Sequence, residues 1–172
     1  MSSNDAEQII TIIVVLALLA MFLLPMLLFF VYVFYQNSKR KKIRSRVLSA
    51  MQQLGASHAS LPVRYSSEER FKAWWKIFPW EGAGLLFVAP GVIHFFGEKN
   101  SGQRLELHLT PENSRVNWLG KCPWPNGAVS WFEIQTPTEK HYFSSETGPF
   151  IFGSHNSTRG IYDELNRNLL HA

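Results

Sequence analysis

Few side chains in this sequence have the type and spacing that catalysis or metal binding requires. The histidines are His58, His94, His108, His141, His155 and His171. No two of them lie four residues apart, the spacing that places two imidazoles on one face of a zinc-binding helix. We interpret them as surface or strand residues, and His94, within an aromatic stretch, as a half-buried packing residue. The sequence therefore predicts no metal ion and no cofactor.

Cys122 is the single cysteine and the strongest candidate nucleophile. Lys121 precedes it, and a neighbouring base lowers the pKa of a thiol. A catalytic thiol also needs a histidine partner, which sequence spacing neither supplies nor excludes. The sequence has no glycine-rich phosphate loop, nucleophile elbow or carboxylate cluster. We therefore predict a protein that is not an enzyme, with a thiol-dependent enzyme at Cys122 as an alternative.

Basic residues gather in one short segment, the basic collar. Its members are Lys39, Arg40, Lys41, Lys42, Arg44 and Arg46. Such a cluster attracts anionic lipid headgroups by ~1 kcal/mol per base. From Arg64 to Ala172 the chain has 11 Lys and Arg against 11 Asp and Glu, so the basicity of the whole chain belongs to the collar. Nucleic-acid binding needs a basic face, which residues 64–172 do not supply, so we expect no nucleic-acid partner. At the collar we expect contact with anionic lipid headgroups.

A run of 27 residues, from Ile9 to Tyr35, contains no Asp, Glu, Lys, Arg or His. As an α-helix it would be ~40 Å long, more than the ~30 Å hydrocarbon core of a bilayer. A buried helix of a soluble domain fits poorly, because the run has no polar face. A cleaved signal peptide would need a basic start, a shorter apolar stretch and a small-residue cleavage site, and none is present. We therefore predict a transmembrane helix over residues 9–35.

The charges that flank this run are asymmetric. Asp5 and Glu7 precede it, and the basic collar follows it. Lys and Arg near the ends of a span remain on the cytoplasmic side. We therefore expect residues 1–8 to form a tail outside the cell and the chain from residue 36 onward to lie in the cytoplasm, anchored in the plasma membrane, or the inner membrane of a bacterium. A single cysteine suits that reducing compartment.

Beyond the span, residues 36–55 have helical periodicity. The apolar stripe consists of Ile43, Val47, Met51 and Leu54, which lie on one helical face. Gly55 is a stop signal, so we expect one long helix that leaves the bilayer and ends near Gly55. The stripe must pack against a partner helix, a second copy of the chain, the membrane surface or the chain's own domain. The sequence leaves these four open.

A linker and a short aromatic helix are predicted next. Residues 56–65 are rich in Ser, Ala, His and Pro and have the composition of a linker. Ser66 and Glu69 match a capping box, and Pro79 would end the helix that starts there. Its apolar side carries Phe71, Trp74, Trp75 and Phe78. We interpret this helix as the first core element of a domain over residues 66–172, with an amphipathic helix in the membrane interface as the alternative.

Short strands and a final helix complete the predicted domain. Alternation and turn residues predict strands at 85–89, 92–96, 103–109, 115–119, 129–136, 141–145 and 150–153. A helix is predicted from Ser157 to Leu170, because Ile161, Leu165 and Leu169 recur on one face. The fold class is therefore one transmembrane helix followed by a cytoplasmic α+β domain of about seven mainly antiparallel strands and a carboxy-terminal helix.

This order of elements resembles the pleckstrin-homology-like superfamily. The stretches that carry the resemblance are residues 84–96, similar to the opening hairpin of a GRAM domain, and residues 131–144, similar to a later hairpin. The resemblance covers about residues 80–172 and implies a bent β-barrel with the helix at one open end. It also implies an interaction module that binds phosphoinositides, peptides or proteins. The loop Ala89-Pro90-Gly91 has no charge, which disfavours specific headgroup recognition.

Together these features predict a single-pass, membrane-anchored, non-catalytic interaction or scaffolding module. An accessory subunit of a membrane protein complex is the role we expect, with a protein partner or a second copy of the chain bound through the juxtamembrane helix or the barrel surface. The alternative is a sensor of anionic lipid that uses the basic collar and the tryptophan-rich helix.

Overall fold

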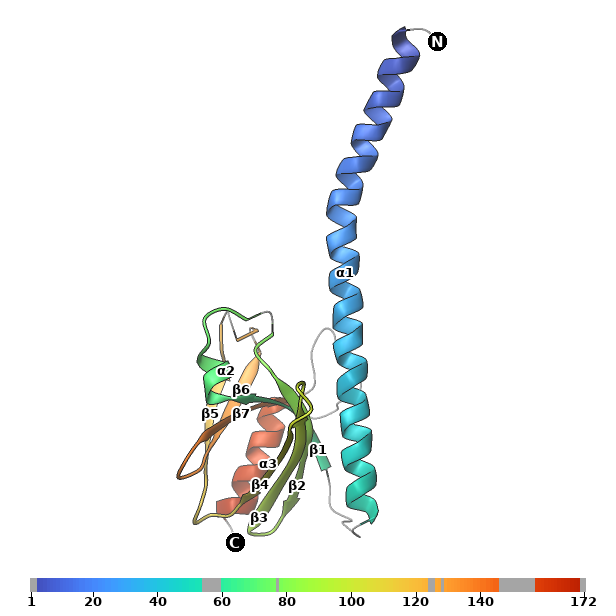
Figure 1. Ribbon diagram of the computed structural model, residues 1–172. Coiled ribbons are helices and arrows are strands. Elements are labelled where there is room, and N and C mark those ends of the chain that lie inside the picture. Colours follow the sequence, from blue (N-terminus) through green and yellow to red (C-terminus); the bar gives the residue numbers. More distant parts are fainter. Residues whose placement is uncertain are drawn as a thin grey trace. The chain divides into compact units, whose positions relative to one another are not determined.

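The computed structural model describes residues 3–53, 60–76, 78–123, 126–127, 129–145 and 157–170 of the 172-residue chain. The chain divides into two units, residues 1–38 and 39–172. The described residues form three helices and seven strands, labelled in Figure 1. The unit from residue 39 onward contains all seven strands, and each unit is described by itself.

Helix α1 covers Ser3–Gln53 and includes Pro25 in its interior. Its Thr11–Ala50 segment is long and apolar enough to cross a membrane. The most apolar 18-residue window has a mean hydropathy of 3.1, and none of that window is buried. The prediction of one long helix is confirmed, and its last described residue lies two positions before Gly55.

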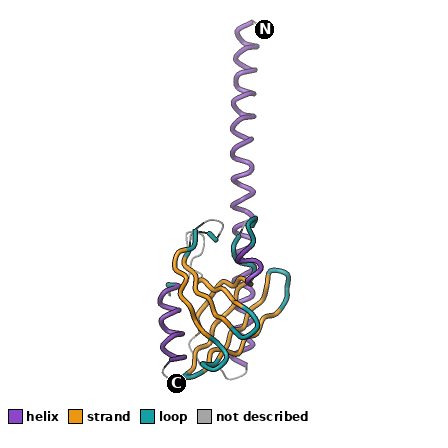
Figure 2. Tube along the Cα trace, turned by 90° about the vertical axis from the view of Figure 1, so that its left-hand side faces the viewer, coloured by secondary structure: helices purple, strands orange, loops and turns teal. Residues whose placement is uncertain are grey.

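The seven strands form one antiparallel sheet, drawn in orange in Figure 2. Their order in the sheet is β4-β3-β2-β1-β7-β6-β5, so β4 and β5 are the edge strands. Two further helices accompany the sheet, a five-residue α2 after β1 and α3 at the carboxy-terminal end. The bounds are β1 Ser60–Ser67, α2 Glu68–Lys72, β2 Gly82–Ala89, β3 Val92–Lys99, β4 Arg104–Leu109, β5 Arg115–Lys121, β6 Ser130–Gln135, β7 Lys140–Ser145 and α3 Thr158–Leu170.

Strand β1 corrects the predicted linker at residues 56–65. Residues 60–65 are strand, and Leu61, Val63 and Tyr65 are buried at alternating positions. Pro62, which obscured this alternation, pairs with β2, whereas pairing with β7 begins only at Val63. Among the described residues, the strand at Pro62 therefore has the one-sided pairing of an edge, where a proline is tolerated.

The aromatic helix is much shorter than predicted. Helix α2 begins after Ser67, whose Oγ accepts a hydrogen bond from the backbone N–H of Arg70, so Ser66 is not the N-cap. The helix ends at Lys72. The Lys76 ammonium donates to the carbonyl oxygens of Arg70 and Phe71, which satisfies the carbonyls of the last turn. The predicted helix is therefore wrong beyond Lys72.

Six of the seven predicted strands are confirmed as β2 to β7, with ends shifted by up to three residues. The seventh, at residues 150–153, lies outside the described residues. Because β1 comes first, the hairpin at residues 84–96 is β2–β3 and does not open the sheet. The carboxy-terminal helix is confirmed as α3, one residue shorter than predicted.

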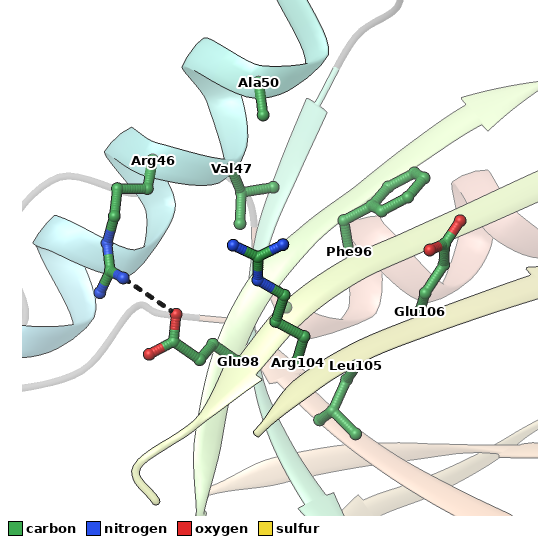
Figure 3. Close-up of a pocket in the computed structure, with 9 residues that line it drawn as sticks. Arg46, Val47, Ala50, Phe96, Glu98, Arg104, Leu105 and Glu106 are labelled. Atoms are coloured by element: carbon green, nitrogen blue, oxygen red, sulfur yellow. Dashed lines mark ion pairs between the residues drawn. The ribbon is translucent and has the colours of Figure 1, made fainter. Parts of the chain in front are cut away.

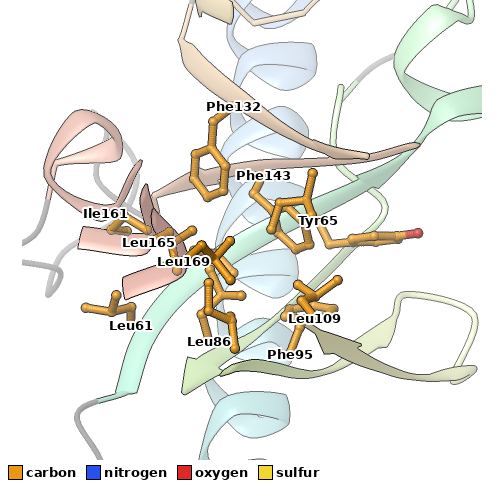
Figure 4. Close-up of a cluster of buried hydrophobic side chains, with 13 residues drawn as sticks. Leu61, Tyr65, Leu86, Phe95, Leu109, Phe132, Phe143, Ile161, Leu165 and Leu169 are labelled. Carbon is orange, nitrogen blue, oxygen red and sulfur yellow. The ribbon is translucent and has the colours of Figure 1, made fainter. Parts of the chain in front are cut away.

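The core lies between the sheet and α3, as Figure 4 shows. Ile161, Leu165 and Leu169 contribute one side of α3 to it, as the periodicity predicted. The Phe143 ring packs edge-on against Phe95, with ring centroids 4.9 Å apart. The buried cluster is Leu61, Val63, Tyr65, Leu86, Ile93, Phe95, Leu109, Phe132, Ile134, Phe143, Ile161, Leu165 and Leu169.

Candidate functional site

The basic collar divides into bases that bind the domain and bases that face solvent. Lys39 Nζ donates to the carbonyl oxygen of Asn100, and Arg46 Nη1 lies 3.3 Å from Glu98 Oε2. Arg40 is only 4% exposed. Lys41 and Lys42 are exposed, and no ion pair of theirs is seen in the described part of the chain. Some of the six bases of the collar are therefore engaged by the domain, and Lys41 and Lys42 remain exposed.

Trp80 joins this part of α1 to the sheet. The Arg40 guanidinium lies 5.4 Å from the centroid of the Trp80 ring, and the buried Arg64 guanidinium of β1 lies 4.2 Å from it. Phe78 stacks on the same ring, with centroids 5.3 Å apart. Cation–π contacts of desolvated arginines are worth up to about 2 kcal/mol each. Arg40 therefore has a structural role within residues 39–172.

The apolar stripe is accounted for at two of its four residues. Ile43 is fully buried. Val47 lines a groove together with Phe96 of β3 and Leu105 of β4, so this part of the stripe faces the chain's own sheet. The Met51 side chain and Leu54 lie outside the described residues.

That groove, shown in Figure 3, is small and electrically balanced. Its volume is about 230 Å³, below the range of about 300–1,000 Å³ of typical small-molecule pockets. Arg46 and Arg104 line it together with Glu98 and Glu106. Because the two cations face two carboxylates, the groove does not select a charged ligand.

Residues 68–81, which link β1 to β2, form the aromatic connection. Phe71, in its first half, packs against the sheet. The Phe71 ring stacks on Tyr142 of β7, with ring centroids 4.0 Å apart and rings 2° from parallel. The Phe71 ring also meets Trp131 of β6 edge-on at 5.3 Å. The prediction that this segment supplies a packing residue to the domain is confirmed for Phe71.

Lys76 fixes the second half of the aromatic connection. Its buried ammonium donates to the Arg70 and Phe71 carbonyls and lies 2.6 Å from Asn126 Oδ1. Burial, aided by the nearby Arg70 charge, lowers the pKa of Lys76. Arg70 Nη2 in turn donates to the Phe78 carbonyl at 3.0 Å. Two bases of the connection, Arg70 and Lys76, thus hydrogen-bond backbone carbonyls of the connection itself.

Trp74 and Trp75 lie between Phe71 and Lys76 in sequence and are exposed. They are 82% and 85% exposed, the highest exposures among the described large apolar side chains. The one-sided helix predicted for them does not form, because the helix has already ended at Lys72. The structure therefore separates Phe71, which packs on the domain, from the tryptophans, which do not.

Cys122 lacks the features of an activated nucleophile. Burial raises its pKa, and attraction from Lys76 offsets this only in part. Its Sγ donates a hydrogen bond to the Gly120 carbonyl oxygen at 3.9 Å. The activating base expected from the sequence was Lys121, and the base that acts on the thiol is Lys76. A thiol with a raised pKa is mostly protonated at neutral pH, which weakens the thiol-enzyme alternative.

The sheet brings together one pair of histidines that sequence spacing did not reveal. His94 of β3 and His108 of β4 are direct cross-strand partners, and their Nδ1 atoms lie 3.3 Å apart. They are 14 residues apart in sequence, so strand register was the signal that could have found them. Within the described residues, no group of three or more His, Cys, Asp or Glu side chains could hold a metal ion.

His141 is buried at the start of β7, where its Nδ1 lies 3.2 Å from the Tyr65 hydroxyl. Burial lowers its pKa below the ordinary value of 6.5, although Glu139 attracts the charged form. Unfolding removes that burial, so the unfolded chain binds the proton at a higher pH than the folded chain. We expect stability to decline as the pH falls below 6.5, by at most about 1.4 kcal/mol per pH unit from this one group.

Thermal unfolding of the full chain in detergent, measured from pH 7.5 to 5, tests this expectation. The variant His141→Gln removes the titrating group, so its melting temperature should fall less steeply with pH than that of the wild type. Parallel profiles for the two proteins would show that His141 does not control the acid side of the stability curve.

No protein-family model, no curated protein and no solved structure matches this chain.

Proposed function

We propose that this chain is a single-pass membrane protein with its amino terminus outside the cell and a non-catalytic interaction domain in the cytoplasm. The supporting observation for the anchor is the apolar segment of α1, which is exposed over its most hydrophobic window. A continuous exposed apolar surface of this kind needs a nonpolar environment. Asp5 and Glu7 before the segment and the basic collar after it support the orientation.

The domain is proposed to be a pleckstrin-homology-like barrel related to GRAM domains. Seven antiparallel strands followed by a single helix support this, as does the burial of one side of α3 in the core. Such a domain serves as an interaction module.

Specific recognition of a phosphorylated headgroup is the weaker branch of this proposal. The aromatic connection joins the first two strands of the sheet, where the family binds headgroups, and it contains the bases Arg70, Lys72 and Lys76. Lys72 pairs with Glu68, and the other two bond backbone carbonyls within the connection. These cations are therefore already engaged, whereas a polyphosphorylated ligand needs several available ones.

Protein binding is the stronger branch, and the observation that carries it is the pair of open sheet edges. Within the described residues, strands β4 and β5 each have one strand neighbour, which leaves one side of the backbone available for an added strand. Along β5, the residues Arg115, Asn117, Leu119 and Lys121 are exposed at alternating positions. We propose that a partner in the same membrane adds to this edge, so that the chain acts as an accessory or scaffolding subunit.

Photo-cross-linking in membranes tests this role. A benzophenone amino acid at Leu119 on the β5 edge should give a covalent adduct of discrete mass, identified by mass spectrometry. The matched control is the same amino acid at Pro90, an exposed residue in the β2–β3 turn. Equal labelling at both positions, or a lone monomer after purification in mild detergent, would contradict the proposal.

A further inference from the structure

The exposed pair Trp74 and Trp75 has no cover in the described part of the chain, although each ring carries ~150–250 Å² of surface. We propose that this pair inserts into the interfacial layer of the membrane that holds α1, and so docks the cytoplasmic domain on that membrane. The proposal rests on the anchoring proposed above and adds a second, aromatic point of contact.

The shape of the aromatic connection suits such insertion. Phe71 is clamped against Tyr142 and Trp131 on one side of the pair, and Lys76 is tied to Asn126 on the other. The tryptophans are therefore presented from a support that is fixed at both ends. Binding through preordered side chains avoids the entropic cost of ordering a loop.

The location of the connection within residues 39–172 points to the membrane as the occupant. The chain enters this unit at Lys39, which donates to the Asn100 carbonyl. The Asn100 N–H donates to the carbonyl of Glu81, the last residue of the connection. Arg40 lies over Trp80, one residue earlier. The connection thus returns to the sheet beside the point where the chain arrives from its apolar segment.

Residue type favours the same occupant. Tryptophan is enriched at membrane–water interfaces, where the ring lies among the headgroups and its N–H remains hydrated. Lys41 and Lys42, two and three residues beyond Lys39, are exposed and suit the anionic surface beside such an interface. A headgroup layer that adjoins the end of the span lies within a few residues of Lys39.

Tryptophan quenching by brominated lipids measures this insertion directly, because the predicted span at residues 9–35 contains no tryptophan. The full chain is reconstituted in proteoliposomes whose lipids carry bromine near the top of the acyl chains. We expect these lipids to quench part of the wild-type emission, and the variant Trp74→Phe/Trp75→Phe to lose most of that quenching. The matched control is Trp118→Phe, whose ring lies against Tyr162 and Arg159 and should leave the quenching unchanged.

Equal quenching of the wild type and the double variant would overturn the insertion. A covalent dimer cross-linked through position 75, found without lipid quenching, would also overturn the insertion. It would assign the tryptophan pair to contact with a second copy of the chain. Alkaline carbonate extraction of the same proteoliposomes separates the two proposals. Release of the chain by carbonate would show that the anchor fails, whereas a retained chain without lipid quenching would show that only the docking fails.

Discussion

Replacing Gly84 with alanine is expected to destabilise the sheet by about 3 kcal/mol or more, at the upper end of the cost of overpacking a core. Gly84 of β2 lies directly opposite Gly97 of β3. A Cβ on Gly84 would lie 2.3 Å from the Phe96 carbonyl oxygen and 2.6 Å from Cε2 of Phe95. The first contact is with backbone, so a side-chain rotation cannot relieve it.

The Phe95 ring cannot move aside either. It is fully buried and packs against Tyr65 and Phe143, and it also approaches the position that a Cβ on Gly97 would occupy, to 2.5 Å. The two glycines therefore leave the space that this ring fills. Any side chain at Gly84 must separate β2 from β3 or displace the centre of the core.

Thermal unfolding of the full chain in detergent, followed by near-ultraviolet circular dichroism, measures the effect. A loss of about 3 kcal/mol corresponds to a drop of roughly 10 °C or more in melting temperature for a domain of this size. The control is Gly160→Ala in α3, where the added methyl meets only the Ser157 hydroxyl and alanine favours a helix by up to about 1 kcal/mol. Similar melting temperatures for Gly84→Ala and the wild type would show that β2 and β3 are not packed as described.

The parts of the fold that could be predicted are those whose burial repeats with a clean period. The alternation of β4 and the recurrence of Ile161, Leu165 and Leu169 identified a strand and a helix, because each element buries one face. Strand β1 was missed for a specific reason. Pro62 suggests a break, yet it lies where β1 has a neighbour on one side only among the described residues.

The predicted length of the aromatic helix was wrong because a tertiary contact overrides the local sequence pattern. The spacing of Phe71, Trp74 and Trp75 is helical, but Lys76 reaches back to the carbonyls of Arg70 and Phe71. That contact depends on the position of Asn126, 50 residues away, which no local pattern contains. The separation of a packed phenylalanine from two exposed tryptophans followed from the fold.

The exposure of the basic collar could not be predicted from local sequence either. The sequence identified six bases beside the span, but which of them face solvent depends on Asn100, Trp80 and Glu98. These partners come from the β3–β4 turn, the aromatic connection and strand β3, all far from the collar in sequence. Composition therefore predicted a basic surface, and the contacts determine how much of the collar remains exposed.

The proposed arrangement of the chain about the membrane predicts the second large effect, which is all-or-none. Two single-cysteine variants, Ser2→Cys and Ser101→Cys, are made in a Cys122→Ser background. Ser101 is exposed in the β3–β4 turn, so a cysteine there is open to reagents in the folded domain. Right-side-out membrane vesicles from cells that produce each variant are then treated with a membrane-impermeant maleimide.

We expect the maleimide to label Ser2→Cys in sealed vesicles and to label Ser101→Cys only after detergent opens them, because one apolar span separates the two positions. Both variants should remain in the membrane after alkaline carbonate washing. Labelling of Ser101→Cys in sealed vesicles, or release of the chain by carbonate, would contradict a single anchor that holds an interaction domain in the cytoplasm.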